Sequence, residues 1–583
     1  MTVDFHNTNT LWASILAETF YRCGMTMAVV CPGSRSTPLT MAFAAHLHIT
    51  TLPVLDERSA AFFALGRAKK TGLPTALICT SGTAGANFYP AVIEAKESGI
   101  PLIILTADRP AELRHCHAGQ TIDQVKLYGN LPNWQCELAL PEANLNMLSY
   151  LRQNAIQAWK RSLFPTPGVV HINLPFREPL APLVQPEVAE LKKDLIPEDF
   201  LAAISEQFAP DSTAVSSGAS LPFHHWQQKS GIIIAGLAQP QDPEGYCRAI
   251  ACLSRTLSFP VLAEALSPLR NYAELNPYLI STYDSILRQH EIAMALVPEV
   301  VIQIGELPTS KILRQWLNNL DVRRWIIERR SDNFDPLHGK TIHLRGTIER
   351  LVDDLQDSSV SLEPSSLSEY CQQWCSAEIK TRNNLDLALK SLNTLYEGKV
   401  AWLLSQSLPT ATPIFLANSM SIRNAEYFWQ PNDRRIVPYF SRGANGIDGT
   451  LSTALGIAYQ DRGILLTGDL ALLHDTNGFL VAQKFSGHLT IIVINNRGGG
   501  IFEMLPIANF STEFEEYFAT PQAVNISRLC AAYGIEHQTI RSWLQLENLL
   551  QNLPEVGIRV LEINCDRHLD ATWLKDNLGN FSQ

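Results

Sequence analysis

The sequence predicts an α/β protein with three open, mostly parallel sheets that carry helices on both faces. Short runs of β-branched and aliphatic residues alternate with stretches of helical periodicity, a pattern typical of parallel sheets covered on both sides. The chain has 583 residues, too many for a single hydrophobic core, so several domains are expected.

The first block, residues 1–185, begins with a predicted helix and continues as strands and helices in turn. Apolar residues in LWASILAETFYRCG recur at the spacing of one helical face, and Gly24 is expected to end this helix. Each strand candidate after it ends in a polar turn with glycine or proline. These candidates are MAVVCPGSRS, PTALICTSGT, PLIILTADRP and GVVHINLPF.

A central α/β domain is expected over residues 186–355. Its opening stretch, 186–222, has weak periodicity and is typical of a linker on a surface. Strands are expected at 231–236, 259–264, 300–305 and 323–328. The first turn of this domain reads GLAQPQ instead of GxGxxG, so it lacks the dinucleotide-binding fingerprint.

The last block, residues 390–583, repeats the alternation after an acidic, serine-rich stretch, and residues 356–389 are expected to be a linker. The three blocks have a similar size and rhythm, which suggests related open-sheet domains. The strand candidates of the last block are PIFLANSMSIRN, RIVPYFSRGANGIDG, GILLTGDL, LTIIVINNRGG and IRVLEINCD.

Composition narrows the classes of function. The net charge of −11 argues against a general nucleic-acid or membrane-surface binder, although a local basic pocket remains compatible with it. The opening residues lack the basic and apolar segments of a signal peptide, and no apolar run reaches bilayer length, so a cytoplasmic protein is expected.

The 11 cysteines contain no CxxC pair. Cys31 and Cys79 fall inside apolar runs and are expected to be buried, reduced thiols. A metal site at Cys371 and Cys375 is disfavoured, because no histidine or second cysteine pair is near them in the sequence.

The most informative motif is Gly468-Asp469-Leu470, with Asn495-Asn496 at the end of the next predicted strand. Parallel strands deliver the residues after them to the carboxyl edge of the sheet, where α/β proteins bind ligands. A carboxylate and an amide oxygen are hard ligands that suit Mg²⁺ and leave positions for phosphate and water. The motif therefore predicts a metal site that binds a phosphate, with two ordinary strand-to-helix turns as the alternative.

Asp56-Glu57-Arg58 lies within a second informative stretch, TLPVLDERSAAFFALG. By itself this triplet indicates a helix start, since acids in the first turn complement the helix dipole. The competing interpretation is that Glu57 activates a bound cofactor.

The order of several motifs resembles one branch of the thiamine-diphosphate-dependent enzymes, the SEPHCHC synthases. The Gly-Asp and Asn-Asn pair is similar to the GDG and NN signature of the whole family, with Leu470 in place of the second glycine. PGSRSTPL and SRGANGIDG are the most specific, because they separate this branch from acetolactate synthases and pyruvate decarboxylases. The similar segments are residues 31–39, 55–66, 79–95, 105–113 and 441–456.

The resemblance implies a thiamine-diphosphate-binding fold and a carboligase of menaquinone or phylloquinone biosynthesis. Such an enzyme decarboxylates 2-oxoglutarate and adds the succinyl carbanion equivalent to isochorismate. Glu57 is the implied catalytic residue, because a carboxylate on the aminopyrimidine N1′ favours the imino tautomer of the cofactor. The resemblance also implies a homodimer or dimer of dimers, with Glu57 and Asp469 meeting across a subunit interface.

The resemblance also implies the residues around the cofactor. Asp469, Asn496 and the backbone carbonyl of Gly498 are the implied ligands of Mg²⁺, or of Mn²⁺. The glycines after Asn496 let the backbone approach the diphosphate closely. Without the resemblance, Ile501 and Phe502 would be assigned to the core. The implied cofactor-binding residues are Glu57, Gly468, Asp469, Asn496, Gly498, Gly499, Ile501 and Phe502.

Both implied substrates carry several negative charges, and arginine recognises carboxylates better than lysine. A single arginine in such a turn is usually a surface ion-pair residue, but four inside family motifs favour an anion site. Two positions depart from the family: Ile312 stands where an arginine is common, and Gly119 where an asparagine is common. The implied substrate-site residues are Ser34, Arg35, Arg109, Gln120, Lys311, Ser419, Arg423 and Arg442.

Two other functions remain open at this stage. An acetolactate-type synthase would keep the cofactor but use pyruvate, a small monocarboxylate that does not require so many arginines. A catalytically silent sensor or scaffold would be expected to lose the activating glutamate or the metal acid. This chain has both, at Glu57 and Asp469.

Overall fold

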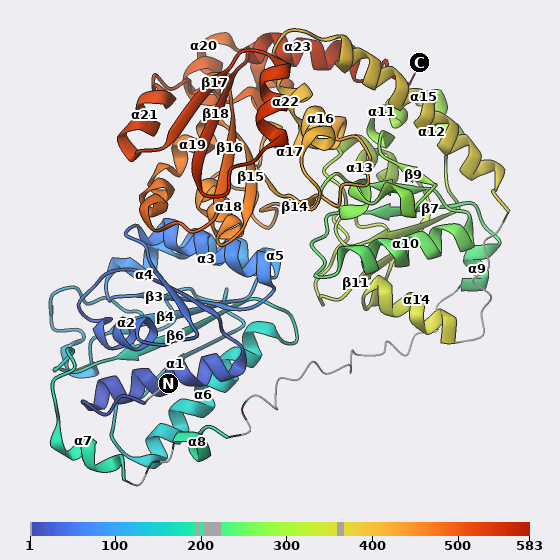
Figure 1. The fold of residues 1–583 in the computed structure, drawn as a ribbon. Helices are drawn as coiled ribbons and strands as arrows, with labels where there is room; N and C mark the ends of the chain where they lie inside the picture. Colours follow the sequence, from blue (N-terminus) through green and yellow to red (C-terminus); the bar gives the residue numbers. More distant parts are fainter. Residues whose placement is uncertain are drawn as a thin grey trace. The chain divides into compact units, whose positions relative to one another are not determined.

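The computed structural model describes residues 3–193, 195, 197–202, 204, 223–357 and 366–582. The chain forms two compact units (Figure 1). The first unit contains residues 1–212, 441–461 and 474–487, and the second contains residues 213–440, 462–473 and 488–583. Each unit therefore joins segments that are far apart in the sequence.

The first unit contains a six-stranded sheet in which every strand pair is parallel, in the order β2-β1-β3-β4-β6-β5. The four strands predicted for this block are β1, β3, β4 and β6. The two edge strands β2 and β5 were not predicted, because their sequences TTLP and WQCE are short and lack a continuous apolar run. The strands are β1 (Met27–Val30), β2 (Thr50–Pro53), β3 (Thr75–Cys79), β4 (Leu102–Asp108), β5 (Trp134–Glu137) and β6 (Val169–Pro175).

Helix α1 shows how the sequence sets its own ends. Asn7 and Thr10 form a capping box at its start, and Gly24 ends it with a φ of 116°, as predicted. The helices of this unit are α1 (Thr8–Cys23), α2 (Thr37–Ala44), α3 (Glu57–Thr71), α4 (Thr83–Asn87), α5 (Tyr89–Ser98), α6 (Leu145–Leu163), α7 (Pro186–Leu191), α8 (Pro197–Phe200) and α18 (Thr450–Ala458), with the 3-10 helices η1 (Ala111–Leu113) and η5 (Thr476–Lys484).

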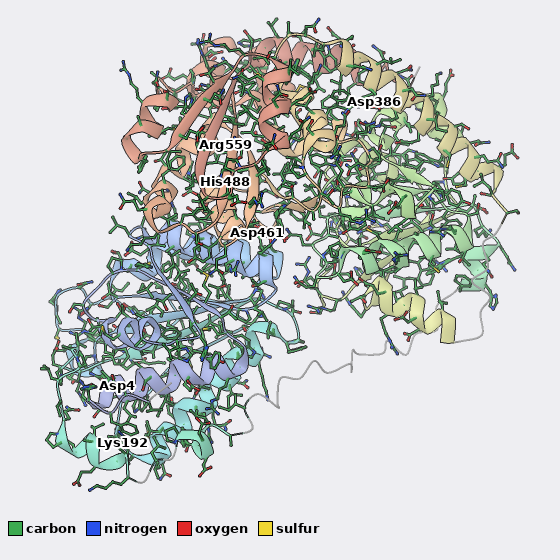
Figure 2. All side chains as sticks on the ribbon, viewed as in Figure 1. Asp4, Lys192, Asp386, Asp461, His488 and Arg559 are labelled. Carbon is green, nitrogen blue, oxygen red and sulfur yellow. The ribbon has the colours of Figure 1, made fainter. Side chains whose placement is uncertain are left out.

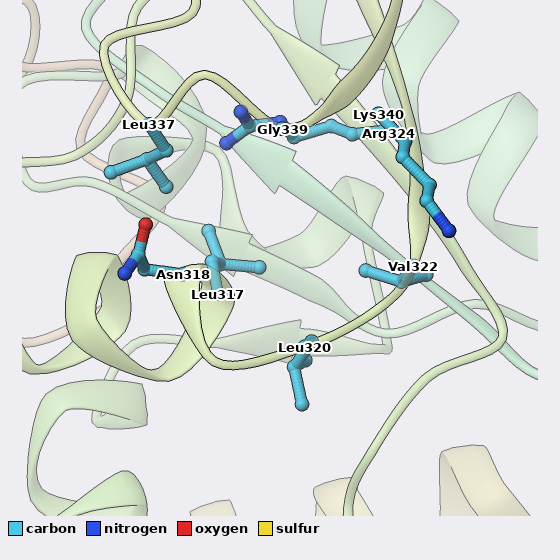
Figure 3. A pocket seen from close by; sticks show the side chains of 8 residues that line it. All are labelled: Leu317, Asn318, Leu320, Val322, Arg324, Leu337, Gly339 and Lys340. Carbon is cyan, nitrogen blue, oxygen red and sulfur yellow. The ribbon is translucent and has the colours of Figure 1, made fainter.

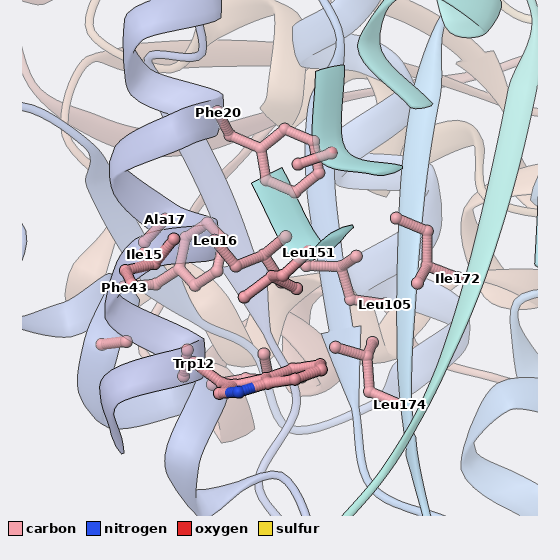
Figure 4. Close-up of a cluster of buried hydrophobic side chains, with 14 of the residues drawn as sticks. Trp12, Ile15, Leu16, Ala17, Phe20, Phe43, Leu105, Leu151, Ile172 and Leu174 are labelled. Carbon is pink, nitrogen blue, oxygen red and sulfur yellow. The ribbon is translucent and has the colours of Figure 1, made fainter. Parts of the chain in front are cut away.

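The core of the first unit lies between α1 and the sheet (Figure 4). Trp12, Leu16 and Phe20 lie one turn apart on α1 and are fully buried together with Leu105 and Ile172 of the sheet. Complete burial of such side chains contributes about 1.5–3 kcal/mol each. This packing holds the strand ends in fixed positions.

Helix α18 comes from the C-terminal block but packs against α3 in the first unit. A Cβ on Gly66 would lie 2.0 Å from the Thr453 carbonyl oxygen, and one on Gly456 would lie 2.1 Å from the Phe63 carbonyl oxygen. The two helices therefore meet backbone to backbone. This contact explains the glycines in two of the motifs, ALG at 64–66 and ALG at 454–456.

The second unit contains a middle sheet in the order β12-β11-β10-β7-β8-β9. The four predicted strands of this block are β7, β8, β10 and β11. Two further strands were not predicted: β9 has only two residues and β12 lacks a continuous apolar run. The strands are β7 (Gly231–Ala235), β8 (Val261–Ala263), β9 (Leu279–Ile280), β10 (Val300–Ile304), β11 (Arg323–Glu328) and β12 (Lys340–Arg345).

The middle sheet carries a small pocket lined mainly by apolar side chains (Figure 3). Arg324, one of its lining residues, is buried and pairs with Asp335. Asp335 also accepts the backbone N–H of Gly339 at 2.8 Å, so this pair holds the loop before β12. The helices of this domain are α9 (Phe223–Gln227), α10 (Pro243–Leu257), α11 (Tyr283–Leu287), α12 (His290–Ala295), α13 (Lys311–Asn318) and α14 (Ile348–Asp357), with η3 (Pro268–Asn271) and η4 (Ala273–Leu275).

The third sheet has the order β14-β13-β15-β16-β18-β17, which is the same sequence-order pattern as the first sheet. All five predicted strands are present. Strand β17 was missed because its sequence EHQTI is mostly polar. The strands are β13 (Pro413–Leu416), β14 (Val437–Tyr439), β15 (Arg462–Gly468), β16 (His488–Asn495), β17 (Glu536–Ile540) and β18 (Gly557–Asn564).

A polar bridge crosses two strands inside the third sheet. Thr490 Oγ1 lies 2.7 Å from His488 Nε2 and accepts the Arg559 Nε–H at 2.9 Å. Figure 2 labels His488 and Arg559 on this sheet. Since all three side chains are buried, the bridge satisfies polar groups that would otherwise destabilise the sheet.

Residues 358–365 of the expected linker lie outside the described residues, and from Glu369 the chain forms a long helix. Residues 194, 196, 203 and 205–222 of the earlier expected linker also lie outside them. The remaining helices are α15 (Glu369–Ser391), α16 (Glu397–Ser407), α17 (Met420–Phe428), α19 (Asp469–His474), α20 (Ser511–Phe514), α21 (Ile526–Tyr533), α22 (Trp543–Gln551) and α23 (Arg567–Asn577), with η6 (Gly500–Met504), η7 (Pro506–Asn509) and the π-helical turn η8 (Glu515–Ala519).

A buried ion pair joins the middle and third sheets of the second unit. Arg270 is fully buried, and its Nη2 lies 3.2 Å from Glu426 Oε2. Its Nε and Nη1 donate to the carbonyls of Ala263 and Glu426. None of the helices in the described ranges is long and apolar enough to cross a membrane.

Candidate functional site

Three of the predicted site residues follow strands next to the point where the strand order reverses. In the first and third sheets this point lies between the first and third strands of the domain, β1 and β3 or β13 and β15. Open α/β sheets bind ligands at the carboxyl ends of the strands beside such a point. Arg35 follows β1, Ser419 follows β13, and Asp469 follows β15.

Two arginines come together at the carboxyl edge of the first sheet. Arg35 donates through Nη1 to the Phe176 carbonyl at 2.9 Å, while its Nε is buried without a hydrogen-bond partner within the described ranges. Burial and then the positive charge of Arg35 lower the pKa of Arg109. The mutual repulsion of two close guanidinium groups would be relieved by an anion bound beside them.

Ser81, two residues after the end of β3, holds two of the predicted residues. Arg109 donates through Nη1 to the Ser81 hydroxyl, and Gln120 donates through Nε2 to the Ser81 carbonyl at 3.0 Å. Ser81 was not among the residues predicted from the sequence. Its position inside the motif CTSGTAG could have indicated it.

Ser34 and Arg442 lie in loops of the first unit. Ser34 is exposed in the turn before α2, and Arg442 is half-buried in the loop after β14. That loop is held by Glu94, whose carboxylate accepts the backbone N–H groups of Gly443 at 3.2 Å and Ala444 at 2.7 Å. The SRGANG motif is thereby fixed to α5 of the same unit.

Glu57 is the first residue of α3. The residues around it, Asp56, Arg58 and Ser59, form hydrogen bonds with residues 474–477. Glu57 itself is half-buried. The start of α3 is therefore held on both sides of Glu57. The three bonds are Asn477 Nδ2 to Asp56 Oδ2 at 2.7 Å, Arg58 Nη2 to the His474 carbonyl at 2.8 Å, and Ser59 Oγ to Asp475 Oδ1 at 3.4 Å.

Asp475 is the buried centre of this arrangement. It accepts the Ser452 backbone N–H at 2.7 Å and the Ser452 hydroxyl at 3.1 Å. Burial raises the pKa of Asp475 to about 6 against the lowering effect of these bonds. It therefore ties the starts of α18 and α3 to one another.

The turn after β15 meets the turn after β16 in the second unit. Asp469 is buried and accepts two backbone N–H groups, from Leu470 at 2.9 Å and from Gly498 at 3.0 Å. Burial raises the pKa of Asp469 to about 6. A buried carboxyl with so little cationic compensation fits a site that a metal ion completes.

Asn496 adds an oxygen with no partner to this turn. Its Nδ2 donates to Glu397 Oε2 at 3.2 Å, while its Oδ1 is buried without a hydrogen bond in the described part of the chain. Buried amide oxygens nearly always have a partner. An orphaned amide oxygen near a buried carboxylate fits the ligand set of a hard divalent cation, with a backbone carbonyl as a further ligand.

The turn after Arg497 requires a glycine at position 498 for steric reasons. Gly498 has a φ of 131°, and a Cβ there would lie 2.2 Å from the Ala519 carbonyl oxygen. Arg497 also has a positive φ, 59°, and its carbonyl accepts a bond from Arg567 Nη1 at 3.0 Å. The turn thus depends on backbone that only glycine can supply at Gly498.

Ile501 and Phe502 follow in η6 and are half-buried. Ile501 packs against the core of the third sheet, and the Phe502 ring contacts that of Phe518 at a centroid distance of 5.6 Å. Gly468, at the end of β15, has open space where a Cβ would be. Their assignment to cofactor binding remains a prediction.

Ser419, Arg423 and Lys311 lie near the junction of the middle and third sheets. Ser419 precedes α17 with a φ of 69°, and its carbonyl accepts a bond from Arg423 Nη1 at 2.7 Å. Arg423 interacts electrostatically with Glu264, which also accepts the Thr309 N–H at 2.7 Å. Lys311 is exposed at the start of α13, two residues after Thr309.

Sequence reasoning missed Glu397, the carboxyl that contacts Asn496. In the sequence it is an ordinary acid before an apolar helix, and only the fold reveals that it is buried. Among the described residues, no three His, Cys, Asp or Glu side chains form a metal-binding group. A cation at Asp469 would therefore need amide and backbone ligands.

Comparison with protein-family models gives three consecutive matches. The N-terminal thiamine pyrophosphate-binding domain of thiamine pyrophosphate enzymes matches residues 12–127. The middle domain of these enzymes matches residues 209–416, and the C-terminal thiamine pyrophosphate-binding domain matches residues 419–563. The three matches have the same order along the chain as the three sheets.

Curated relatives match over the whole chain. A protein from Gloeothece citriformis is 62% identical over 584 residues, with 100% of both chains covered. One from Rippkaea orientalis is 58% identical, covering 100% of this chain and 98% of its own, and one from Trichodesmium erythraeum is 58% identical with 100% of both covered. All three are named 2-succinyl-5-enolpyruvyl-6-hydroxy-3-cyclohexene-1-carboxylate synthase.

Proposed function

The chain belongs to the family of thiamine pyrophosphate enzymes, and from that premise we propose that it makes 2-succinyl-5-enolpyruvyl-6-hydroxy-3-cyclohexene-1-carboxylate (SEPHCHC). In the proposed reaction 2-oxoglutarate loses CO₂, and its remaining four-carbon unit is added to isochorismate. The product is an intermediate of menaquinone or phylloquinone biosynthesis. The observation that supports this reaction most is the 62% identity over the full length to a relative named for it.

The basic cluster of the first sheet supports substrates with several carboxylates. Arg35 and Arg109 are close enough for the charge of one to lower the pKa of the other. Arg35 retains a buried donor without a partner in the described ranges. Two adjacent guanidinium groups are suited to bidentate recognition of carboxylates, although Glu178 lies 3.5 Å from Arg35 Nη1 and supplies part of the opposite charge.

Thiamine diphosphate, when bound, supplies the electron sink for loss of CO₂ and for carbon–carbon bond formation. Glu57 is the proposed catalytic acid, which hydrogen-bonds the aminopyrimidine ring. Asp56, Arg58 and Ser59 support this role, because their bonds to residues 474–477 hold the start of α3. A fixed carboxyl can share a proton with a ring nitrogen in one defined geometry.

Asp469, Asn496 and the Gly498 carbonyl are the proposed ligands of Mg²⁺, with Mn²⁺ as a substitute. The buried carboxylate of Asp469 and the orphaned Asn496 Oδ1 support this set. The open space at Gly468 and the glycines after Arg497 would let the diphosphate lie against backbone N–H groups.

We further propose that the active protein is a cytoplasmic homodimer or dimer of dimers. The aminopyrimidine would bind residues 1–185 of one subunit, and the diphosphate would bind residues 390–583 of its partner. Residues 186–355 would form the central domain, with 356–389 as the connection. Sedimentation of the purified protein with and without thiamine diphosphate and Mg²⁺ tests the subunit number.

A turnover assay tests the reaction. The full-length protein is given thiamine diphosphate, Mg²⁺ and 2-oxoglutarate, first alone and then with isochorismate, while CO₂ and the ring product are measured. We expect SEPHCHC only when both substrates are present, and loss of turnover when EDTA removes the metal. Faster turnover of pyruvate would contradict the assignment, and tight cofactor binding without turnover of any 2-oxo acid would indicate a silent member of the family.

A further inference from the structure

Glu397 is a buried carboxyl with no part in the site residues inferred from the sequence. It is the first residue of α16 and is 6% exposed. Its backbone N–H donates to Asp570 Oδ2 at 3.3 Å, which fixes the start of the helix against α23. Its side chain is directed to two asparagines, Asn424 of α17 and Asn496 in the turn after β16.

Both asparagines direct the NH₂ group of their side-chain amide at Glu397. Asn496 donates through Nδ2 at 3.2 Å, and the side chain of Asn424 is also hydrogen-bonded to Glu397. The Oδ1 atoms of both amides are buried and have no partner in the described ranges. In both contacts a Glu397 carboxyl oxygen is the acceptor, so the contact holds the NH₂ end of each amide.

This orientation matters because an asparagine amide can turn over. With its NH₂ group toward the metal, Asn496 could not bind a cation. Gly500 closes the space beside the same group, since a Cβ there would lie 2.7 Å from Asn496 Nδ2. A buried and unbonded Asn496 Oδ1 destabilises the folded protein, and a bound cation removes this cost.

We propose that Glu397 is a positioning residue for the divalent metal: it accepts the Asn496 NH₂ group and so keeps the Asn496 carbonyl oxygen available to the cation. The inference rests on the proposed Mg²⁺- and thiamine-diphosphate-dependent function. Glu397 is not itself a proposed ligand; it lies between α17 and the turn that contains Asn496. Partners of this kind typically change metal affinity 10–100-fold when they are removed.

The test measures metal affinity instead of turnover. Full-length protein is stripped with EDTA, and Mg²⁺ is titrated by calorimetry in the presence of thiamine diphosphate. We expect Glu397→Gln to bind Mg²⁺ about 10–100-fold more weakly than the wild type, because the introduced amide can offer Asn496 either a donor or an acceptor. An affinity within twofold of the wild type would overturn the proposal.

Glu378→Gln is the matched control. Glu378 is also a buried carboxyl of the second unit, and it accepts bonds from Ser281 and Thr282, away from the metal turn. This variant should lose thermal stability and keep the Mg²⁺ affinity of the wild type. An equal loss of affinity in both variants would show a general effect of removing buried carboxyls and would overturn the proposal.

A double variant that exchanges the donor and the acceptor between positions 397 and 496 tests whether Glu397 acts by orienting the side chain at 496 or only by packing against it. In Glu397→Gln/Asn496→Asp, the introduced glutamine can donate to the introduced carboxylate, which offers the metal an oxygen at either end. This double variant should bind Mg²⁺ more tightly than Asn496→Asp alone, and this comparison holds even if Glu397→Gln does not fold. Equal affinities would overturn the proposal. Failure of the wild type to bind Mg²⁺ with thiamine diphosphate would overturn the proposed function as well.

Discussion

Burial changes the chemistry of several carboxyl groups that look ordinary in the sequence. Burial raises the pKa of Asp469 to about 6 and that of Glu397 to about 7. The pKa of Asp570 rises to about 8, through burial first and then the nearby charge of Glu397. Asp469 and Glu397 contact the turn that holds Asn496, and Asp570 contacts the Glu397 backbone. A cation there would stabilise their charged forms, which fits a site built for metal binding.

Glu57 is the residue with the most direct test. We expect Glu57→Gln to fold and to bind thiamine diphosphate and Mg²⁺ normally, while turnover falls by about 10²-fold or more, because the amide cannot share a proton with the aminopyrimidine. Calorimetry and the turnover assay measure the two properties separately.

The control for Glu57 is Glu190→Gln, which removes an exposed acid of α7 in the same unit. It should leave both properties unchanged. Near-normal turnover in Glu57→Gln would remove the catalytic role of Glu57, and a loss of cofactor binding would mean that its effect is structural.

At the scale of elements, α3 and α18 form one rigid pair within the first unit. Their glycines bring the two backbones into contact, and Asp475 ties both helix starts together. Contacts between backbones leave little room for adjustment, because no side chain can change its rotamer to absorb a shift. The pair therefore holds Glu57, at the start of α3, in a defined position.

The sign of the change in the free energy of unfolding caused by Gly66→Ala tests this contact. In an exposed helix, glycine to alanine stabilises by up to about 1 kcal/mol. Here the new Cβ would lie 2.0 Å from the Thr453 carbonyl oxygen, so we expect a loss of about 1–3 kcal/mol in the free energy of unfolding, measured with urea.

Gly119→Ala is the matched control, because nothing lies within 4 Å of the position of its Cβ. It should change the free energy of unfolding by less than about 0.5 kcal/mol. A stabilising effect of Gly66→Ala would contradict the close approach of α3 and α18.

At the scale of the whole molecule, buried acids control how stability depends on pH. In the second unit, burial raises the pKa of Asp570 to about 8, and burial followed by the nearby Glu264 raises that of Glu426 despite its pairing with Arg270. Unfolded carboxyls titrate near about 4. The folded state therefore binds more protons than the unfolded state up to about pH 8.

The free energy of unfolding of the metal-free protein should fall as the pH rises from about 7 to about 8. The sign follows because raised carboxyl pKa values stabilise the folded state at low pH, and this stability is lost as the pH passes the folded values, at up to about 1.4 kcal/mol per pH unit for each group. The buried His171 and His488 have pKa values lowered to about 4, so their opposite contribution is complete below this window.

Urea denaturation in EDTA at several pH values measures this slope. Asp570→Asn removes one of the titrating groups and keeps an acceptor for the Glu397 N–H, so it should flatten the slope. A free energy that rises between pH 7 and 8 would contradict the raised pKa values.

The sequence determined the three parallel sheets and most of their strands, because buried parallel strands require continuous apolar runs that are visible without a structure. It also determined that arginines and oxygen ligands follow those strands. The missed strands β2, β5, β9, β12 and β17 are short or polar and take their structure from a neighbouring strand.

Only the tertiary structure decided which of these residues meet. Ser81 joins Arg109 to Gln120, residues 474–477 hold the start of α3, and Glu397 contacts Asn496. These contacts connect residues that are distant in sequence, and nothing in local periodicity encodes them. The same is true of the raised carboxyl pKa values, because desolvation is a property of the packed molecule.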